Sequence, residues 1–234
     1  GGWAIQATGQ SAYGPFSADV VIRSGRGPMV IDVNRLTFAG IDFQGRVVQS
    51  RGGPFVGTLT LAGQGLEGSV RLSAAGRYQR LDIAATANGA RTPGDVPIML
   101  QRGFVRASVI LYPDAPEIVG DAQLAGLASG DLLVERARVR IDYRGGNGSA
   151  QLFAEGRRGV PFRLAANAAL TPELIRAAVQ GHVNNIGFRF AQPAQIRRAG
   201  SEWVLDPVTL LLEQGRVRLA GRYGDGLIIQ SRLD

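Results

Sequence analysis

The chain has 234 residues, no cysteine and a formal net charge of +7 at pH 7. Apolar residues make up 45% and charged residues 19% of the chain, a balance that excludes intrinsic disorder. The absence of cysteine excludes disulfides, thiolate nucleophiles and cysteine-based metal sites.

A strand-and-turn rhythm then runs from end to end. Segments such as Ser69–Ser73 alternate polar and apolar residues, a period typical of a sheet with one wet and one dry face. Turn sequences such as Gly52-Gly53-Pro54 and Asn88-Gly89 separate them, which favours an antiparallel meander. In chain order we expect strands at residues 3–8, 17–23, 29–39, 41–49, 55–62, 66–74, 77–87, 97–111, 117–127, 132–143, 148–156, 161–169, 183–191, 202–212, 215–222 and 226–233.

The segment 171–180 fits two structures. Thr171-Pro172-Glu173 has the cap, proline and acid of a helix start, and Gly181 could end that helix. The following Leu174–Val179 also fits a short strand entered from a proline turn. Both alternatives stay open, so we expect at most one short helix.

Few residues suited to catalysis are present. His182 is the only histidine, and the acids Asp32, Asp42, Asp82, Asp142 and Asp206 alternate with apolar neighbours, so they are interpreted as partners of arginines on adjacent strands. The 26 basic residues are all arginine, spread along the strands rather than clustered with aromatics, which argues against nucleic-acid binding. They are interpreted as a solvated surface, with attraction of anionic lipid headgroups as the alternative. We expect no enzyme activity, no cofactor and no metal site.

The apolar residues of these strands form a candidate inward set. It consists of Phe55, Leu59, Leu61, Val70, Leu72, Leu81, Ile83, Val139, Ile141, Tyr143, Leu152, Phe162, Leu164, Ile186, Phe188, Phe190, Val217 and Leu219. Three packings could cover this set: a closed outer-membrane barrel, a sandwich of two sheets, or a sheet folded over into an open, greasy cleft. The barrel is disfavoured, because aromatic residues make up only 7% of the chain.

Two stretches carry a resemblance to a known family. NAALTPELIRAAVQG at residues 167–181, and WVLDPVTL at 203–210 followed by GRVRLAGRYGDG at 215–226, are similar to segments of the TamB/AsmA-like family, the inner-membrane components of the translocation and assembly module. The resemblance covers residues 120–234, and the first half is similar in strand style. It implies an all-β fold: a long, curved, mostly antiparallel sheet folded into a U-shaped (taco-like) hydrophobic groove. We therefore treat residues 1–234 as a single elongated segment of a longer protein.

The family implies a function as well. This would be a periplasmic β-groove, tethered to the inner membrane outside this chain, that shields acyl chains and conducts phospholipid between the two membranes. Support of outer-membrane protein assembly with a TamA-like barrel partner is implied too. The alternative from the residues is a structural or interaction module, either a β-sandwich or a chaperone-like sheet that binds outer-membrane protein segments at its edge.

Overall fold

The computed structural model describes residues 2–11, 14–38, 40–51, 53–91, 97–200, 202–223 and 227–233, with the side chains of all but 11, 14, 227–229 and 231–233. It contains eighteen strands: β1 (Gly2–Ser11), β2 (Gly14–Arg23), β3 (Val30–Phe38), β4 (Ile41–Gln49), β5 (Phe55–Gly63), β6 (Leu66–Ala75), β7 (Tyr78–Arg91), β8 (Ile98–Ile110), β9 (Glu117–Ser129), β10 (Leu132–Arg144), β11 (Asn147–Arg158), β12 (Val160–Leu170), β13 (Leu174–Val183), β14 (Ile186–Phe190), β15 (Ala194–Ala199), β16 (Glu202–Leu212), β17 (Arg216–Tyr223) and β18 (Leu227–Leu233).

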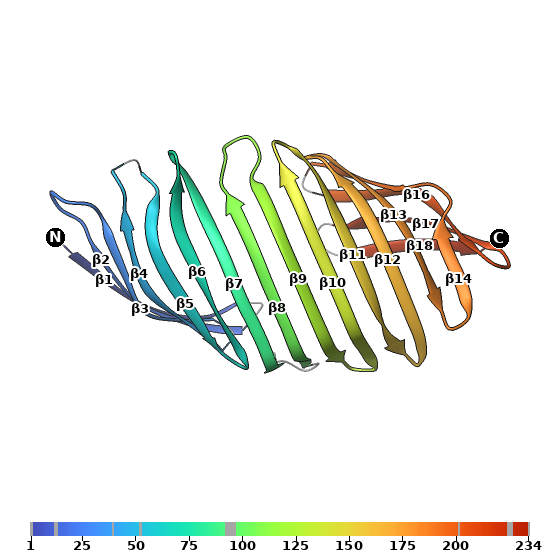
Figure 1. Cartoon of the computed structure of the whole chain (residues 1–234), viewed down its shortest axis with the longest axis horizontal. Helices are drawn as coiled ribbons and strands as arrows, with labels where there is room; N and C mark the ends of the chain where they lie inside the picture. The colour runs from blue at the N-terminus through green and yellow to red at the C-terminus, as the bar shows by residue number, and fades with distance from the viewer. Residues whose placement is uncertain are drawn as a thin grey trace.

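The strands form one antiparallel meander, in which each strand pairs with the next (Figure 1). Only β14 and β15 differ, because both lie between β13 and β16 and together fill one of 17 strand positions. The described part of the chain contains no helix, and hence none that could span a membrane. The predicted fold class, an all-β chain with one long antiparallel sheet, is confirmed.

The segment 171–180, which fitted either a helix or a strand, contains a turn followed by the strand β13. Thr171 makes a tight turn with Leu174: its backbone N–H donates to the Leu174 carbonyl at 2.9 Å, and its hydroxyl accepts from the Leu174 N–H at 3.1 Å. This turn feeds β13, which pairs with β12 on one side and with β14 and β15 on the other. Partners on both sides stabilise the extended form over the local helix signals, because tertiary context outweighs weak propensity.

One strand was not predicted. The expected strand at 183–191 is the shorter β14, and β15 follows it after a break that contains Pro193. Proline has no N–H to donate to a ladder, so the chain leaves the sheet there and re-enters at Ala194. Opposite this region, β16 has an irregularity between Leu205 and Val208, where Asp206 accepts two hydrogen bonds from Arg197 at 2.6 and 2.8 Å.

The sheet is a single layer. Contacts between elements occur between strands that are neighbours in the sheet, and no second sheet packs on either face of the described residues. The accessible surface is 15273 Å², whereas a compact protein of 24.8 kDa exposes roughly 10,000 Å². The described strands therefore do not form the β-sandwich considered from the sequence, and about 5,000 Å² of surface is left that a second layer would have removed from water.

The sheet is strongly twisted. The strands at its two ends, β1–β2 and β16–β18, run at a steep angle to the central strands β7–β12 (Figure 1). Right-handed twist of about 20–25° per strand pair accumulates in this way when no second layer flattens the sheet. The backbones of β4 and β5 also approach closely: Gly57 has φ +154°, and a Cβ there would lie 2.1 Å from the Arg46 carbonyl oxygen. Only glycine tolerates so close an approach of the two backbones.

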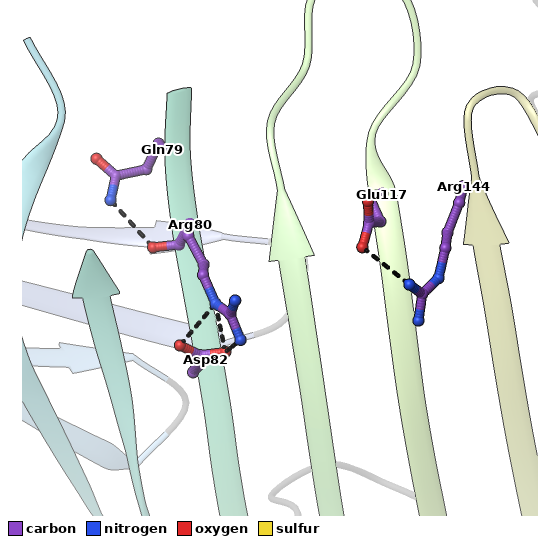
Figure 2. A network of polar contacts seen from close by, with 5 residues as sticks. All are labelled: Gln79, Arg80, Asp82, Glu117 and Arg144. Carbon is purple, nitrogen blue, oxygen red and sulfur yellow. Dashed lines mark hydrogen bonds and ion pairs between the residues drawn. The ribbon is translucent and has the colours of Figure 1, made fainter. Parts of the chain in front are cut away.

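Near one end of the central strands, Gln79 joins strands that do not pair directly. Its Oε1 accepts from the Phe55 N–H at 2.7 Å, and its Nε2 donates to the carbonyls of Phe55 and Ser73 at 2.9 and 3.0 Å. Nε2 also contacts the Arg80 carbonyl, drawn in Figure 2. The β5–β6 ladder ends at Gly57 and Leu72, so this amide satisfies backbone groups of Phe55 beyond that point.

Candidate functional site

Strand register determines which side chains share a face. Residues directly opposite one another in an antiparallel pair point to the same side, and side chains alternate along each strand. Starting from Leu59, the pairing leads to Val70, Ile83 and Ala107 and, through β9, to Ile141. We call this side of the sheet the apolar face and the other side the charged face.

The structure places the whole candidate inward set on the apolar face. Each residue is linked by cross-strand pairs or by two-residue steps to the row of Leu59 and Ile141. These residues are Phe55, Leu59, Leu61, Val70, Leu72, Leu81, Ile83, Val139, Ile141, Tyr143, Leu152, Phe162, Leu164, Ile186, Phe188, Phe190, Val217 and Leu219. That they line a lipid groove stays a prediction.

The apolar face is continuous across the sheet. Among the described side chains, its only charged members are Arg158 and Arg198, each at or next to the end of its strand. With strands about 4.8 Å apart, 17 positions extend the face over roughly 75–80 Å along the sheet. The face thus forms one long apolar band without a charge in its interior.

This band is half-exposed rather than buried. Val139, Leu152 and Ile186 are 41%, 36% and 53% exposed, and no large side chain of the described residues is fully buried. A hollow of about 220 Å³ lies on this face over β6–β10, with Leu66, Leu100 and Val139 in its lining. A surface of this kind can accept flexible hydrocarbon without any rearrangement of the backbone.

The charged face pairs its acids with arginines. Asp32 contacts Arg46 at 3.0 Å and also pairs with Arg23. Asp32, Asp42 and Asp206 pair with arginines of neighbouring strands as predicted, whereas the ion pairs of Asp82 and Asp142 are with arginines of their own strands. In Figure 2, Arg80 holds Asp82, and Arg144 lies 3.7 Å from Glu117. Hydrogen bonds from Arg80 lower the pKa of Asp82, and hydrogen bonds from Arg197 lower the pKa of Asp206.

A second concave region lies on the charged face, and the sequence did not reveal it. This arginine hollow, of about 630 Å³, is lined by Arg102, Phe104, Gln123, Arg136, Arg138, Phe153, Glu155 and Arg163, with further contributions from backbone and small residues. Its members come from β8 to β12. Phe104 and Phe153 stand at polar positions of the alternating pattern, a signal that could have marked the site.

No metal centre emerges from the geometry. The part of the chain that the structure describes contains no group of three or more His, Asp or Glu side chains that could hold an ion. His182 is exposed on the charged face, where it lines a hollow of about 620 Å³ that adjoins the arginine hollow. The two hollows share Phe153 and Arg163.

Fold and surface together define a class: a single-layer, all-β meander with one continuous apolar face and one arginine-rich face. No family model, curated protein or solved structure matches this chain. The resemblance to the TamB/AsmA-like family therefore stays a prediction from residue pattern.

Proposed function

We propose that this chain is a periplasmic segment that shields acyl chains on its apolar face and conducts phospholipid between the inner and outer membranes, or supports outer-membrane protein assembly. The observation that carries the proposal is the apolar face itself, which crosses 17 strand positions without an interior charge and without a covering layer among the described residues. The tether to the inner membrane and the contact with a TamA-like partner belong, in this proposal, to regions outside this chain.

The energetics favour hydrocarbon as the occupant. Moving a 16-carbon acyl chain from water to an apolar surface is worth about 12 kcal/mol at most, at roughly 0.8 kcal/mol for each CH₂ group. The half-exposed aliphatic side chains of the face, such as Val139 and Leu152, recover part of that value on contact. A bound acyl chain in turn removes these side chains from water.

Movement along the face follows from its uniformity. The row through Leu59, Val70 and Ile83 continues strand by strand with small or aliphatic side chains. Neighbouring positions therefore offer similar contacts, so an acyl chain meets low barriers to sliding and a high barrier to leaving for water. Polar headgroups stay in solvent beyond the face, which allows headgroups of different chemistry.

The test compares two neighbouring residues of β11. Leu152 lies on the apolar face and Gln151 on the charged face, so Leu152→Asp and Gln151→Asp add the same charge to opposite sides of one strand. We expect the parent chain to copurify with phospholipid detected by mass spectrometry, Leu152→Asp to lose most of it, and Gln151→Asp to keep it. Equal lipid content in all three, or no lipid in the parent, would contradict the proposal.

A crosslinking experiment in cells tests the same face in its own compartment. A photoreactive amino acid at Ile141 or Phe188 is expected to label phospholipid. The same group at Arg140, which lies on the charged face beside Ile141, is the control. Labelling of lipid from Arg140 but not from Ile141 would contradict the assignment of faces.

One feature favours a second candidate, chaperone-like binding at an edge. Among the described strands, β1 pairs with β2 alone, so its outer backbone groups are open to another strand, and Trp3 and Ile5 beside them are 70% and 45% exposed. An extended outer-membrane protein segment could add there as a further strand. Binding of such a peptide, blocked by proline at Ala4 and insensitive to Leu152→Asp, would favour this function over lipid passage.

A further inference from the structure

The arginine hollow lies on the side of the sheet that the proposed lipid path does not use. Together with the adjoining hollow around His182 it forms a concave region of two parts, about 630 and 620 Å³, joined at Phe153 and Arg163. Volumes of this size are typical of small-molecule sites. Its residues come from successive paired strands, with a register shift in the β10–β11 pairing between Val134 and Arg136, and the backbone hydrogen bonds of the sheet hold them in place.

One row of the hollow is built on a buried carboxylate. Glu155 is 8% exposed and lies opposite Arg136 on one side and Arg163 on the other. Arg136 Nε donates to its Oε1 at 2.6 Å, and Arg163 lies 3.3 Å from its Oε2. The side chains of Arg136 and Arg163 remain 71% and 64% exposed. Each guanidinium has five N–H donors, so Glu155 orients both groups and leaves donors free for a ligand.

The neighbouring row supplies apolar surface. Phe104, Gln123, Arg138 and Phe153 lie opposite one another in sequence across β8–β11. Both phenylalanines are 37% exposed on the face that carries the arginines. Rings at such positions gain little from burial in this chain, so their contact surface is available to a ligand.

The charges of the lining determine what fits. The lining itself carries four arginines and one carboxylate, a net charge of +3, and Asp121 beside the lining pairs with Arg138 at 3.3 Å. Arg102, on β8, has no ion-pair partner among the described residues, and the guanidinium fork matches the oxygens of phosphate. We propose that the arginine hollow binds a phosphate group carried by an organic molecule whose apolar ring or chain rests on Phe153.

Phenyl phosphate is the probe, because it combines both groups in one soluble molecule. Calorimetric titration of the chain is expected to show binding that is stronger than that of inorganic phosphate. The variants Arg102→Gln and Arg163→Lys are each expected to weaken it about tenfold, the usual effect of losing a hydrogen bond to a charged group. Phe153→Leu is expected to remove the preference for phenyl phosphate over inorganic phosphate.

The matched control is Arg218→Gln, which removes one exposed arginine of the charged face on β17, away from the hollow. Circular dichroism confirms that each variant is folded, and Arg102→Gln carries the test if another variant fails to fold. Equal affinity of Arg102→Gln and Arg218→Gln, or no binding by the parent chain, would overturn the proposal.

A second arm separates the two sources of this chemistry. Phosphatidylcholine vesicles with and without phosphatidylglycerol are titrated with the same variants. Binding to phosphatidylglycerol vesicles that Arg102→Gln weakens would identify a lipid headgroup as the source of the phosphate, and binding to phenyl phosphate alone would identify a free molecule. Because Leu152→Asp acts on the opposite face, it is expected to leave phenyl phosphate binding unchanged, so this proposal and lipid passage fail independently.

Discussion

On the apolar face of β5 and β6, Leu59 and Val70 stand opposite one another, and no other described strand packs over them. On the other face of the same strands Thr58 stands opposite Arg71. The two faces share one backbone and differ completely in chemistry. Neither face has a covering layer of the described residues, so stability depends mainly on the ladder and on cross-strand pairs. The apolar face is therefore available for binding without any loss of a packed core.

The largest effect is expected from a substitution that disturbs the backbone beneath both faces. Gly57→Val would place a Cβ 2.1 Å from a backbone carbonyl oxygen at a φ of +154°. We expect a loss of about 3 kcal/mol or more in the free energy of unfolding, measured by urea denaturation. The control is Gly25→Val, whose added Cβ has nothing within 4 Å. Similar midpoints for both variants would contradict the close backbone approach of β4 and β5 at Gly57.

A smaller loss in the free energy of unfolding is expected where the Gln79 side chain bonds to the backbone beyond the end of the β5–β6 ladder. Gln79→Leu removes the hydrogen bonds to the backbone N–H and carbonyl of Phe55. We expect destabilisation by about 2 kcal/mol, because part-buried backbone groups of Phe55 lose their partners. Gln151→Leu, at an exposed position, should stay within about 0.5 kcal/mol of the parent. Thermal unfolding followed by circular dichroism distinguishes them.

The two faces can be compared directly by truncation. In a packed core a Leu→Ala change costs about 2–5 kcal/mol, but Leu59 is only partly buried on an uncovered face. We therefore expect Leu59→Ala to cost about 1–2 kcal/mol without lipid, and Arg71→Ala to cost less than about 0.5 kcal/mol. A cost near 5 kcal/mol for Leu59→Ala in lipid-free protein would mean that another layer covers this face. Added lipid should increase the difference, since it binds the folded state.

The smallest effect on stability is expected from lowering the pH. The pKa of Asp82 and that of Asp206 are lowered in the fold by arginines, so each contributes stability above its unfolded pKa near 4 and loses it as the pH falls through the lower folded value. Both groups are partly exposed and their arginine partners more so, and solvent screening keeps the contribution small. The urea midpoint should fall slightly between pH 5 and pH 2.5, and less so in Asp82→Asn. Asp114→Asn, in an exposed turn, is the control; an identical slope in both variants would argue against the Arg80–Asp82 contact.

Much of the sheet could be predicted because its signals are local. Alternation and turn residues predicted the strands, and the same alternation placed Leu59, Ile141 and Phe188 in one apolar set, which the register confirms as one face. The acids were expected opposite arginines, and Asp32 lies between two of them.

Other features were not predictable, because they depend on residues far apart along the chain. Residues of β13 form a strand rather than a helix because β12 pairs with it on one side and β15 on the other. Strand β15 was not predicted because its six residues are too few to show a period. The arginine hollow needs Phe104 and Phe153, from β8 and β11, to lie three strands apart on one face. A local sequence pattern cannot predict that two residues so far apart along the chain lie on one face of the same site.

By itself the sequence determined a chain of alternating strands with one apolar and one arginine-bearing side, since side chains of an extended backbone point alternately to opposite faces. Only the tertiary structure decided that the described strands form a single layer with no second layer upon it, since whether two apolar surfaces meet depends on how twist accumulates over the whole sheet.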